Sequence, residues 1–120
     1  MELIIGGRSQ GKLQFALTLH GLTPDSAADG ELTPKPVIYN LQSWVRQALA
    51  EKRDPEAELL AFADRHPDTV FVCDQLGCGV VPAEPENRLW RDVTGRLCCL
   101  LAARADRVYR VTAGIGQRIK

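Results

Sequence analysis

The sequence of 120 residues predicts an α/β protein, in which helices flank a mainly parallel sheet. The main observation is that short apolar runs alternate along the chain with stretches whose apolar residues recur at helical spacing. The composition agrees, because 45% hydrophobic and 25% charged residues are typical of a globular protein that buries a core. At this length we expect one domain, comprising residues 1–120.

The first half of the chain predicts two strand–helix units and a further helix. Leu3-Ile4-Ile5 predicts a strand, and a glycine-rich loop then leads into a helix over residues 12–19. Residues 21–36 are rich in Thr, Pro, Asp, Ser and Gly and predict a loop. A second strand is expected at residues 37–39 and a second helix at residues 41–49. A third helix begins at Pro55, which suits a first helical turn, and ends at the break over residues 65–68.

The second half predicts two more strands around a long helix. Residues 69–73 form a continuous β-branched and apolar run, typical of a strand buried on both faces, so we expect this strand to lie centrally. A glycine loop follows at residues 74–82, and Pro85 starts a helix that continues to about Arg104. Residues 107–111 predict the last strand, and a glycine-broken tail closes the chain.

The charge balance excludes several classes of partner. The chain has 15 Lys and Arg against 15 Asp and Glu, so its formal net charge is zero. This balance gives no electrostatic reason to bind nucleic acid or an anionic membrane. No apolar run is long enough to span a bilayer, and residues 1–5 lack a basic leader. We therefore expect a cytoplasmic protein.

The four cysteines do not predict a metal site. They are Cys73, Cys78, Cys98 and Cys99, and they form neither CxxC pairs nor the ligand spacing of a zinc site. We interpret them as reduced thiols that mostly pack in the interior. The alternative is that Cys73 and Cys78, which flank a glycine turn, are redox-active or bind a metal.

The most informative motif follows the first strand. The run Gly6-Gly7-Arg8-Ser9-Gln10-Gly11-Lys12 fits G-x-x-x-x-G-K between a strand and a helix. Glycines let successive backbone N–H groups point into one concavity, and the helix N-terminus adds partial positive charge. Lys12 would supply an ammonium group to terminal phosphates and serve as the catalytic, charge-neutralising group. The alternative is a glycine turn with an exposed lysine.

Two positions differ from a complete phosphate loop and weaken its magnesium site. Position 13 is Leu, where Ser or Thr would place a hydroxyl on Mg²⁺. The second strand ends at Asn40, where many such proteins carry an Asp that holds the ion. We expect the backbone cradle to remain, so the predicted binding residues are Gly6, Gly7, Arg8, Ser9, Gln10, Gly11, Lys12 and Leu13.

Several stretches match motifs of one known family. The family's G-G-A-R-S-G-K-S matches residues 6–13 in spacing, and its N-E-V-G-x-G-I-V-P loop is similar to residues 74–82. Its F-R-D-x-x-G-R-x-N-Q resembles residues 90–99, and its closing D-x-V-Y-x-V-x-x-G-I-x-x-R-x-K matches residues 106–120. The chain therefore resembles the adenosylcobinamide kinase/adenosylcobinamide-phosphate guanylyltransferase family of cobalamin biosynthesis, most closely over residues 69–120.

The resemblance implies a P-loop NTPase-like domain that binds ATP or GTP, phosphorylates adenosylcobinamide and attaches GMP to the product. It also implies a homo-oligomer, since the family forms trimers. The sequence departs from the family in lacking the H-R-x-x-R-P segment whose histidine carries the guanylyl group, and Gln75 stands where the family has Glu. Neither His20 nor His66 lies in such a motif. The alternative function is a catalytically impaired nucleotide-binding or assembly protein of the same fold.

Overall fold

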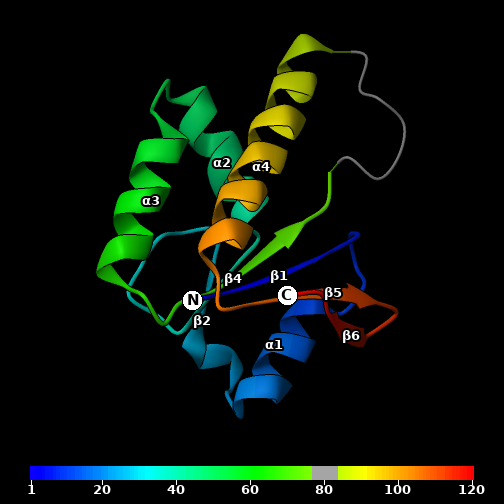
Figure 1. Cartoon of the computed structure of the whole chain (residues 1–120). Helices are drawn as coiled ribbons and strands as arrows, with labels where there is room; N and C mark the ends of the chain where they lie inside the picture. The colour runs from blue at the N-terminus through cyan, green and yellow to red at the C-terminus, as the bar shows by residue number, and fades with distance from the viewer. Residues whose placement is uncertain (77–83) are drawn as a thin grey trace.

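The computed structural model describes residues 1–76 and 84–120, which form one six-stranded sheet with helices on both faces (Figure 1). The strands lie in the order β2-β3-β4-β1-β5-β6. Their bounds are β1 Glu2–Gly6, β2 Ala27–Asp29, β3 Val37–Tyr39, β4 Val70–Asp74, β5 Arg107–Thr112 and β6 Ile115–Arg118. The helices are α1 Lys12–His20, α2 Leu41–Ala50, α3 Pro55–Arg65 and α4 Pro85–Arg104.

The predicted α/β class with a mainly parallel sheet is confirmed. Strand β1 pairs in parallel with both β4 and β5, and β3 pairs in parallel with β2 and β4. The apolar run predicted at residues 69–73 is β4, and it lies inside the sheet between β3 and β1. The register sets Gly6 of β1 beside Asp74 of β4, so both strands end at the same edge of the sheet.

The alternating side chains of the strands feed two separate cores. Leu3 and Phe71 belong to the larger core under α2, α3 and α4, together with Leu101. Ile4 and Val72 point to the opposite face, where helix α1 contributes Ala16 and Leu17. A period of two along each strand therefore gives the sheet two apolar faces, one covered by α1 and the other by α2, α3 and α4 (Figure 1).

The segment expected to be a loop, residues 21–36, contains ordered secondary structure. A 3₁₀ turn spans Pro24–Ser26, and strand β2 follows directly and pairs in parallel with β3 at the edge of the sheet. The prediction of a loop throughout was wrong because Ala27-Ala28-Asp29 is short and low in β propensity. Pairing with β3 forms this strand.

The closing tail is also a strand, which the sequence analysis did not predict. Strand β6 pairs antiparallel with β5 through a two-residue turn at Ala113 and Gly114. These residues have φ of 50° and 77°, as a type I′ hairpin turn requires at both central positions. Alanine is an unusual first residue for this turn, so the hairpin has only a weak sequence signal.

The cysteines within the described residues fit the predicted packing role only in part. Cys73 is fully buried, Cys98 is partly buried beside it, and Cys99 is exposed; Cys78 lies outside the described residues. A hydrogen bond with Cys98, together with burial, raises the pKa of Cys73 well above its usual value. Cys73 is therefore a protonated interior thiol at neutral pH.

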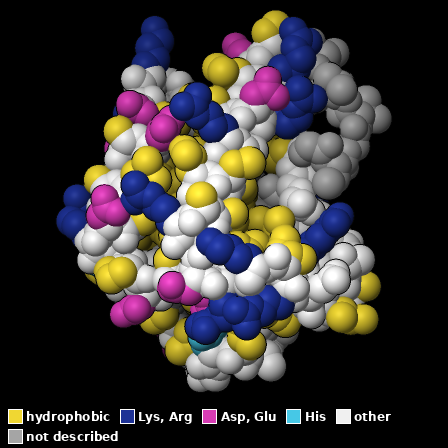
Figure 2. All heavy atoms as spheres, viewed as in Figure 1, with side chains coloured by type: hydrophobic (Ala, Val, Ile, Leu, Met, Phe, Trp, Pro, Cys, Tyr) yellow, Lys and Arg dark blue, Asp and Glu magenta, His cyan; other side chains and the backbone are white. Residues whose placement is uncertain are grey.

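The face seen in Figure 2 carries both positive and negative side chains. Among the described residues, no helix is long and apolar enough to cross a membrane.

The predicted loop at residues 74–82 falls mostly on residues 77–83, which lie outside the described part of the chain. Its first residue, Asp74, is the last residue of β4.

The core face of α4 provides a direct stability test. Leu101 is fully buried, so Leu101→Ala should lower the free energy of unfolding by about 2–5 kcal/mol through lost burial and a residual cavity. Leu89 lies on the same helix and is 54% exposed, so Leu89→Ala should change that free energy by less than about 0.5 kcal/mol. Urea unfolding of both variants measures the difference, and equal midpoints would contradict this packing of α4.

Candidate functional site

The predicted glycine-rich loop joins β1 to α1, as the strand–loop–helix interpretation requires. Strand β1 ends at Gly6 and α1 begins at Lys12. Gly11 caps the helix with φ of 86°, a left-handed conformation that favours glycine. A Cβ atom at Gly6 would collide with the carbonyl oxygen of Val111, so only glycine fits where β1 passes β5.

The far side of the loop is anchored to the β5–β6 hairpin turn. The amide of Gly114 donates to the carbonyl oxygen of Gln10 at 2.7 Å, and the amide of Ala113 donates to Oε1 of Gln10 at 2.8 Å. A Cβ on Gly11 would lie 3.2 Å from the Cα of Gly114, which shows how closely the two segments approach. The hairpin missed by the sequence analysis therefore supports the loop.

The backbone amides of the loop remain available as donors. Within the described part of the chain, none of the amides from Gly7 to Gln14 donates a hydrogen bond to a backbone or side-chain acceptor. The last three of these amides belong to the first turn of α1, whose N–H groups have no intrahelical acceptor. An anion placed there would meet several donors and the positive end of the helix dipole.

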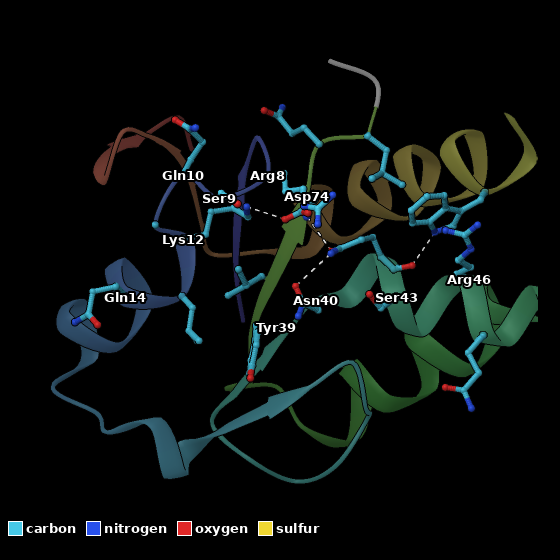
Figure 3. Close-up of a pocket in the computed structure, with 18 of the residues that line it drawn as sticks. Arg8, Ser9, Gln10, Lys12, Gln14, Tyr39, Asn40, Ser43, Arg46 and Asp74 are labelled. Atoms are coloured by element: carbon cyan, nitrogen blue, oxygen red, sulfur yellow. Dashed lines mark hydrogen bonds and ion pairs between the residues drawn. The ribbon is translucent and has the colours of Figure 1, made fainter. Parts of the chain in front are cut away.

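Lys12 is buried rather than exposed, with 6% of its surface accessible. Its Nζ donates to the carbonyl oxygen of Gly7 at 2.7 Å and lies 2.7 Å from Oδ1 of Asp74 (Figure 3). The ammonium group is thereby held across the loop and against the end of β4. This geometry disagrees with the alternative of a glycine turn carrying an exposed lysine.

Gln42 connects this ion pair to α2. Its side chain is buried at 6% exposure; Oε1 accepts the amide of Asp74 at 3.0 Å, and Nε2 donates to Oδ1 of Asn40 at 3.3 Å. Its backbone carbonyl accepts Nε1 of Trp90 on α4 at 2.7 Å. One residue thus joins the ends of β3 and β4 to the long helix.

Asn40 is the left-handed N-cap residue of α2, with φ of 53°. Its Nδ2 donates to Oδ1 of Asp29 at 2.7 Å, while its Oδ1 accepts from Gln42. Desolvation first, and then the charge and hydrogen bond of Asp29, raise the pKa of the neighbouring Tyr39. The end of β3 is therefore tied to β2 by side chains.

These residues surround a cleft of about 1010 Å³ at the carboxyl edge of the sheet. Among its lining residues are three cationic side chains and one carboxylate, namely Arg8, Lys12, Arg46 and Asp74. Figure 3 shows these side chains arriving from the loop, from α1, from α2 and from β4. The excess of positive charge suits an anionic ligand.

Most of the predicted binding residues meet in this cleft. Six of them line it: Arg8, Ser9, Gln10, Gly11, Lys12 and Leu13. Gly6 and Gly7 are not among its lining residues; Gly6 ends β1, and the carbonyl of Gly7 accepts from Lys12.

Sequence reasoning missed Gln42, Arg46 and Trp90, which also line the cleft. A usable signal was present, since Gln42 and Arg46 are four residues apart on a helix that follows a parallel strand. The Lys12–Asp74 ion pair depends on strand order, which the sequence does not reveal.

The donor set of the cleft does not fit a magnesium ion well. Leu13 has no oxygen, both polar atoms of the Asn40 amide are engaged, and Oδ1 of Asp74 already faces an ammonium group. No cluster of three or more His, Cys, Asp or Glu side chains able to hold a metal occurs in residues 1–76 or 84–120. Magnesium prefers oxygen ligands in octahedral geometry, and the cleft offers few of them.

Comparison with known proteins identifies the family. The family model described as "Cobinamide kinase / cobinamide phosphate guanyltransferase" matches residues 35–119. The chain belongs to this family. It is 38% identical over 81 residues to the "Bifunctional adenosylcobalamin biosynthesis protein CobU" of Salmonella typhimurium, and 38% identical over 79 residues to the protein of the same name in Escherichia coli.

The matches cover 66% and 64% of this chain but only 45% and 44% of the two CobU proteins. The chain thus aligns with about half the length of these relatives. The family match begins after the glycine-rich loop, so the assignment is independent of residues 6–13.

The histidines of this family member lie away from the cleft. Nε2 of His20 contacts Oε2 of Glu2 at 2.7 Å at the end of α1, and the ring of His66 lies 4.5 Å from that of Phe62. Neither histidine is among the residues that line the cleft.

The Gln42 network predicts a measurable contribution to stability. Gln42→Ala would leave the amide of Asp74 without its acceptor and should lower the free energy of unfolding by about 1–3 kcal/mol. The exposed neighbour provides a control, because Ser43→Ala should change it by less than about 0.5 kcal/mol. Denaturant unfolding distinguishes them, and a Gln42→Ala midpoint equal to that of the control would show that the network is not stabilising.

Proposed function

We propose that this cobinamide kinase family member binds ATP or GTP in the cleft, with the triphosphate on the loop formed by Gly6 to Leu13. The main supporting observation is that the backbone N–H groups of the loop donate no hydrogen bond within the described residues, and that they lie beside the buried Lys12. Oriented N–H groups, a helix N-terminus and an ammonium group together form a strong anion site. The positive excess among the charged side chains lining the cleft supports the same ligand.

We further propose that the bound nucleotide is the phosphoryl donor for a hydroxyl group of adenosylcobinamide. The curated relatives are named as bifunctional proteins of adenosylcobalamin biosynthesis, which supports this acceptor class. Lys12 would neutralise charge on the transferring phosphoryl group through its third N–H donor, while the other two remain on Gly7 and Asp74. Guanylyl transfer through a covalent histidine is not part of the proposal, because neither histidine reaches the cleft.

A second candidate is a protein that binds nucleotide without phosphoryl transfer. Leu13 favours it, because an apolar side chain stands where transferases of this fold use a hydroxyl on the metal. In this version the fold and the anion site remain and the chemistry is lost. The protein would then act through its nucleotide-dependent conformation or through assembly.

The organisation of the protein is part of the proposal as well. We propose that residues 1–120 act as a single P-loop nucleotide-binding domain in the cytoplasm and associate into homotrimers, as the family resemblance implies. Multi-angle light scattering measures the oligomeric state directly, and a monomer at micromolar concentration would contradict the trimer.

Binding is tested by thermal unfolding with and without nucleotide. ATP or GTP should raise the Tm of the wild type, because a ligand that binds only the folded state stabilises it by mass action. The rise should disappear in Lys12→Ala and persist in Lys35→Ala, which removes an exposed lysine outside the cleft. Each rise is referred to the same variant's own nucleotide-free Tm. An undiminished rise in Lys12→Ala would refute the proposed site.

Phosphoryl transfer is tested by incubating the protein with adenosylcobinamide and ATP or GTP, with and without Mg²⁺, and measuring phosphorylated product by mass spectrometry. The kinase proposal predicts product with the wild type and with Lys35→Ala, and at least a hundredfold less, about 3 kcal/mol in the barrier, with Lys12→Ala. Absence of product from a wild type that still shows the nucleotide-dependent rise in Tm would establish the second candidate instead.

A further inference from the structure

We propose that the cleft binds the nucleoside triphosphate as the free anion, without a divalent cation, and that arginine and lysine side chains supply the neutralising charge. This inference rests on the proposed nucleotide binding, but it holds for both the kinase and the binding-only version. It concerns the ionic form of the ligand that the site selects.

The first observation concerns the start of α1. Leu13 lines the cleft at the position that follows the loop lysine, and its side chain packs against the apolar core that contains Ile4 and Val72. In a complete phosphate loop, a Ser or Thr hydroxyl at this position ligates the cation. An aliphatic side chain offers no lone pair and is held by packing, so this ligand is missing.

The second observation concerns the end of β3. Both polar atoms of the Asn40 carboxamide are hydrogen-bonded, since Nδ2 donates to Asp29 and Oδ1 accepts from Gln42. Turning the Oδ1 towards a cation in the cleft would break the bond from Gln42, which itself holds the amide of Asp74. A neutral amide is also a weaker ligand for magnesium than a carboxylate.

The third observation concerns the charge already present. Asp74 is the single carboxylate among the described lining residues, and its Oδ1 lies 2.7 Å from Nζ of Lys12. A divalent cation on Asp74 would lie next to this ammonium group, and the two positive charges would repel each other in a partly buried site. The side chain best suited to hold a metal is therefore neutralised by the lysine.

Arg46 supplies a further cationic group on the opposite wall of the cleft. Its guanidinium lies 4.5 Å from the centroid of the Trp90 ring and donates to Oδ1 of Asn87 at 3.1 Å. The indole is fixed in turn by its bond to the carbonyl of Gln42. No ion pair in residues 1–76 and 84–120 engages Arg46 or Arg8, so both retain charge for an anion.

The test is the affinity of the wild-type protein for ATP, GTP and inorganic tripolyphosphate, measured by titration calorimetry in excess EDTA and in excess Mg²⁺. We expect binding in EDTA and clearly weaker apparent binding in excess Mg²⁺, because Mg²⁺ complexes the triphosphate and leaves little of the free anion that the site binds. Binding in excess Mg²⁺ that is as tight as in EDTA, or tighter, would overturn the inference while supporting the proposed nucleotide site. No binding under either condition would refute the nucleotide site and the inference with it.

A matched pair of variants isolates the contribution of Leu13. Leu13→Ser adds a hydroxyl at the metal position, whereas Leu13→Ala shortens the side chain to a similar degree without one. Binding by Leu13→Ser should become tighter in Mg²⁺ than in EDTA, and binding by Leu13→Ala should keep the wild-type pattern. The same response to Mg²⁺ in both variants would contradict the role assigned to Leu13.

Discussion

The contact of Lys12 with Asp74 depends on the parallel pairing of β1 with β4, and the site as a whole depends on that contact. The pairing ends both strands at the same edge of the sheet, with Gly6 beside Asp74, and α1 must begin directly above them. The lysine can then reach the carboxylate and the carbonyl of Gly7 at 2.7 Å each. Both contacts hold the glycine-rich loop in place, and its backbone N–H groups remain free to bind an anion.

The site combines a retained scaffold with altered ligands. The strand–loop–helix arrangement and the buried lysine are features of phosphate-binding loops in general. The hydroxyl after the lysine and the acidic group at the end of β3 are replaced by Leu13 and Asn40. Among the neighbouring residues, Gln42 donates to Oδ1 of Asn40, and Lys12 forms an ion pair with Asp74. In a site of this composition, cationic side chains and backbone N–H groups are better suited than a metal ion to neutralise an anionic ligand.

Much of the fold could be predicted, because apolar residues recur at helical spacing or form strand-like runs over residues 37–73 and 85–111. Strands β2 and β6 could not, since Ala27-Ala28-Asp29 and Ile115–Arg118 are short or polar and form only beside a neighbouring strand. The loop residues of the site were found from their motif. Trp90 was not, because it reaches the cleft through the packing of α4 against α2, and helix packing leaves no local trace in the sequence. Gln42 was also missed, although its place on the helix that follows β3 was a usable signal.

The central claim is that the amides between Gly7 and Leu13 bind phosphate oxygens. The most direct measurement is a ¹H–¹⁵N correlation spectrum of the labelled protein during titration with ATP. The account predicts that the largest shifts, mostly downfield as the N–H groups gain charged acceptors, fall on residues 7–13, with the amides of β2 and α3 unaffected. Shifts that cluster elsewhere on the protein, with those of residues 7–13 unchanged at saturation, would contradict it.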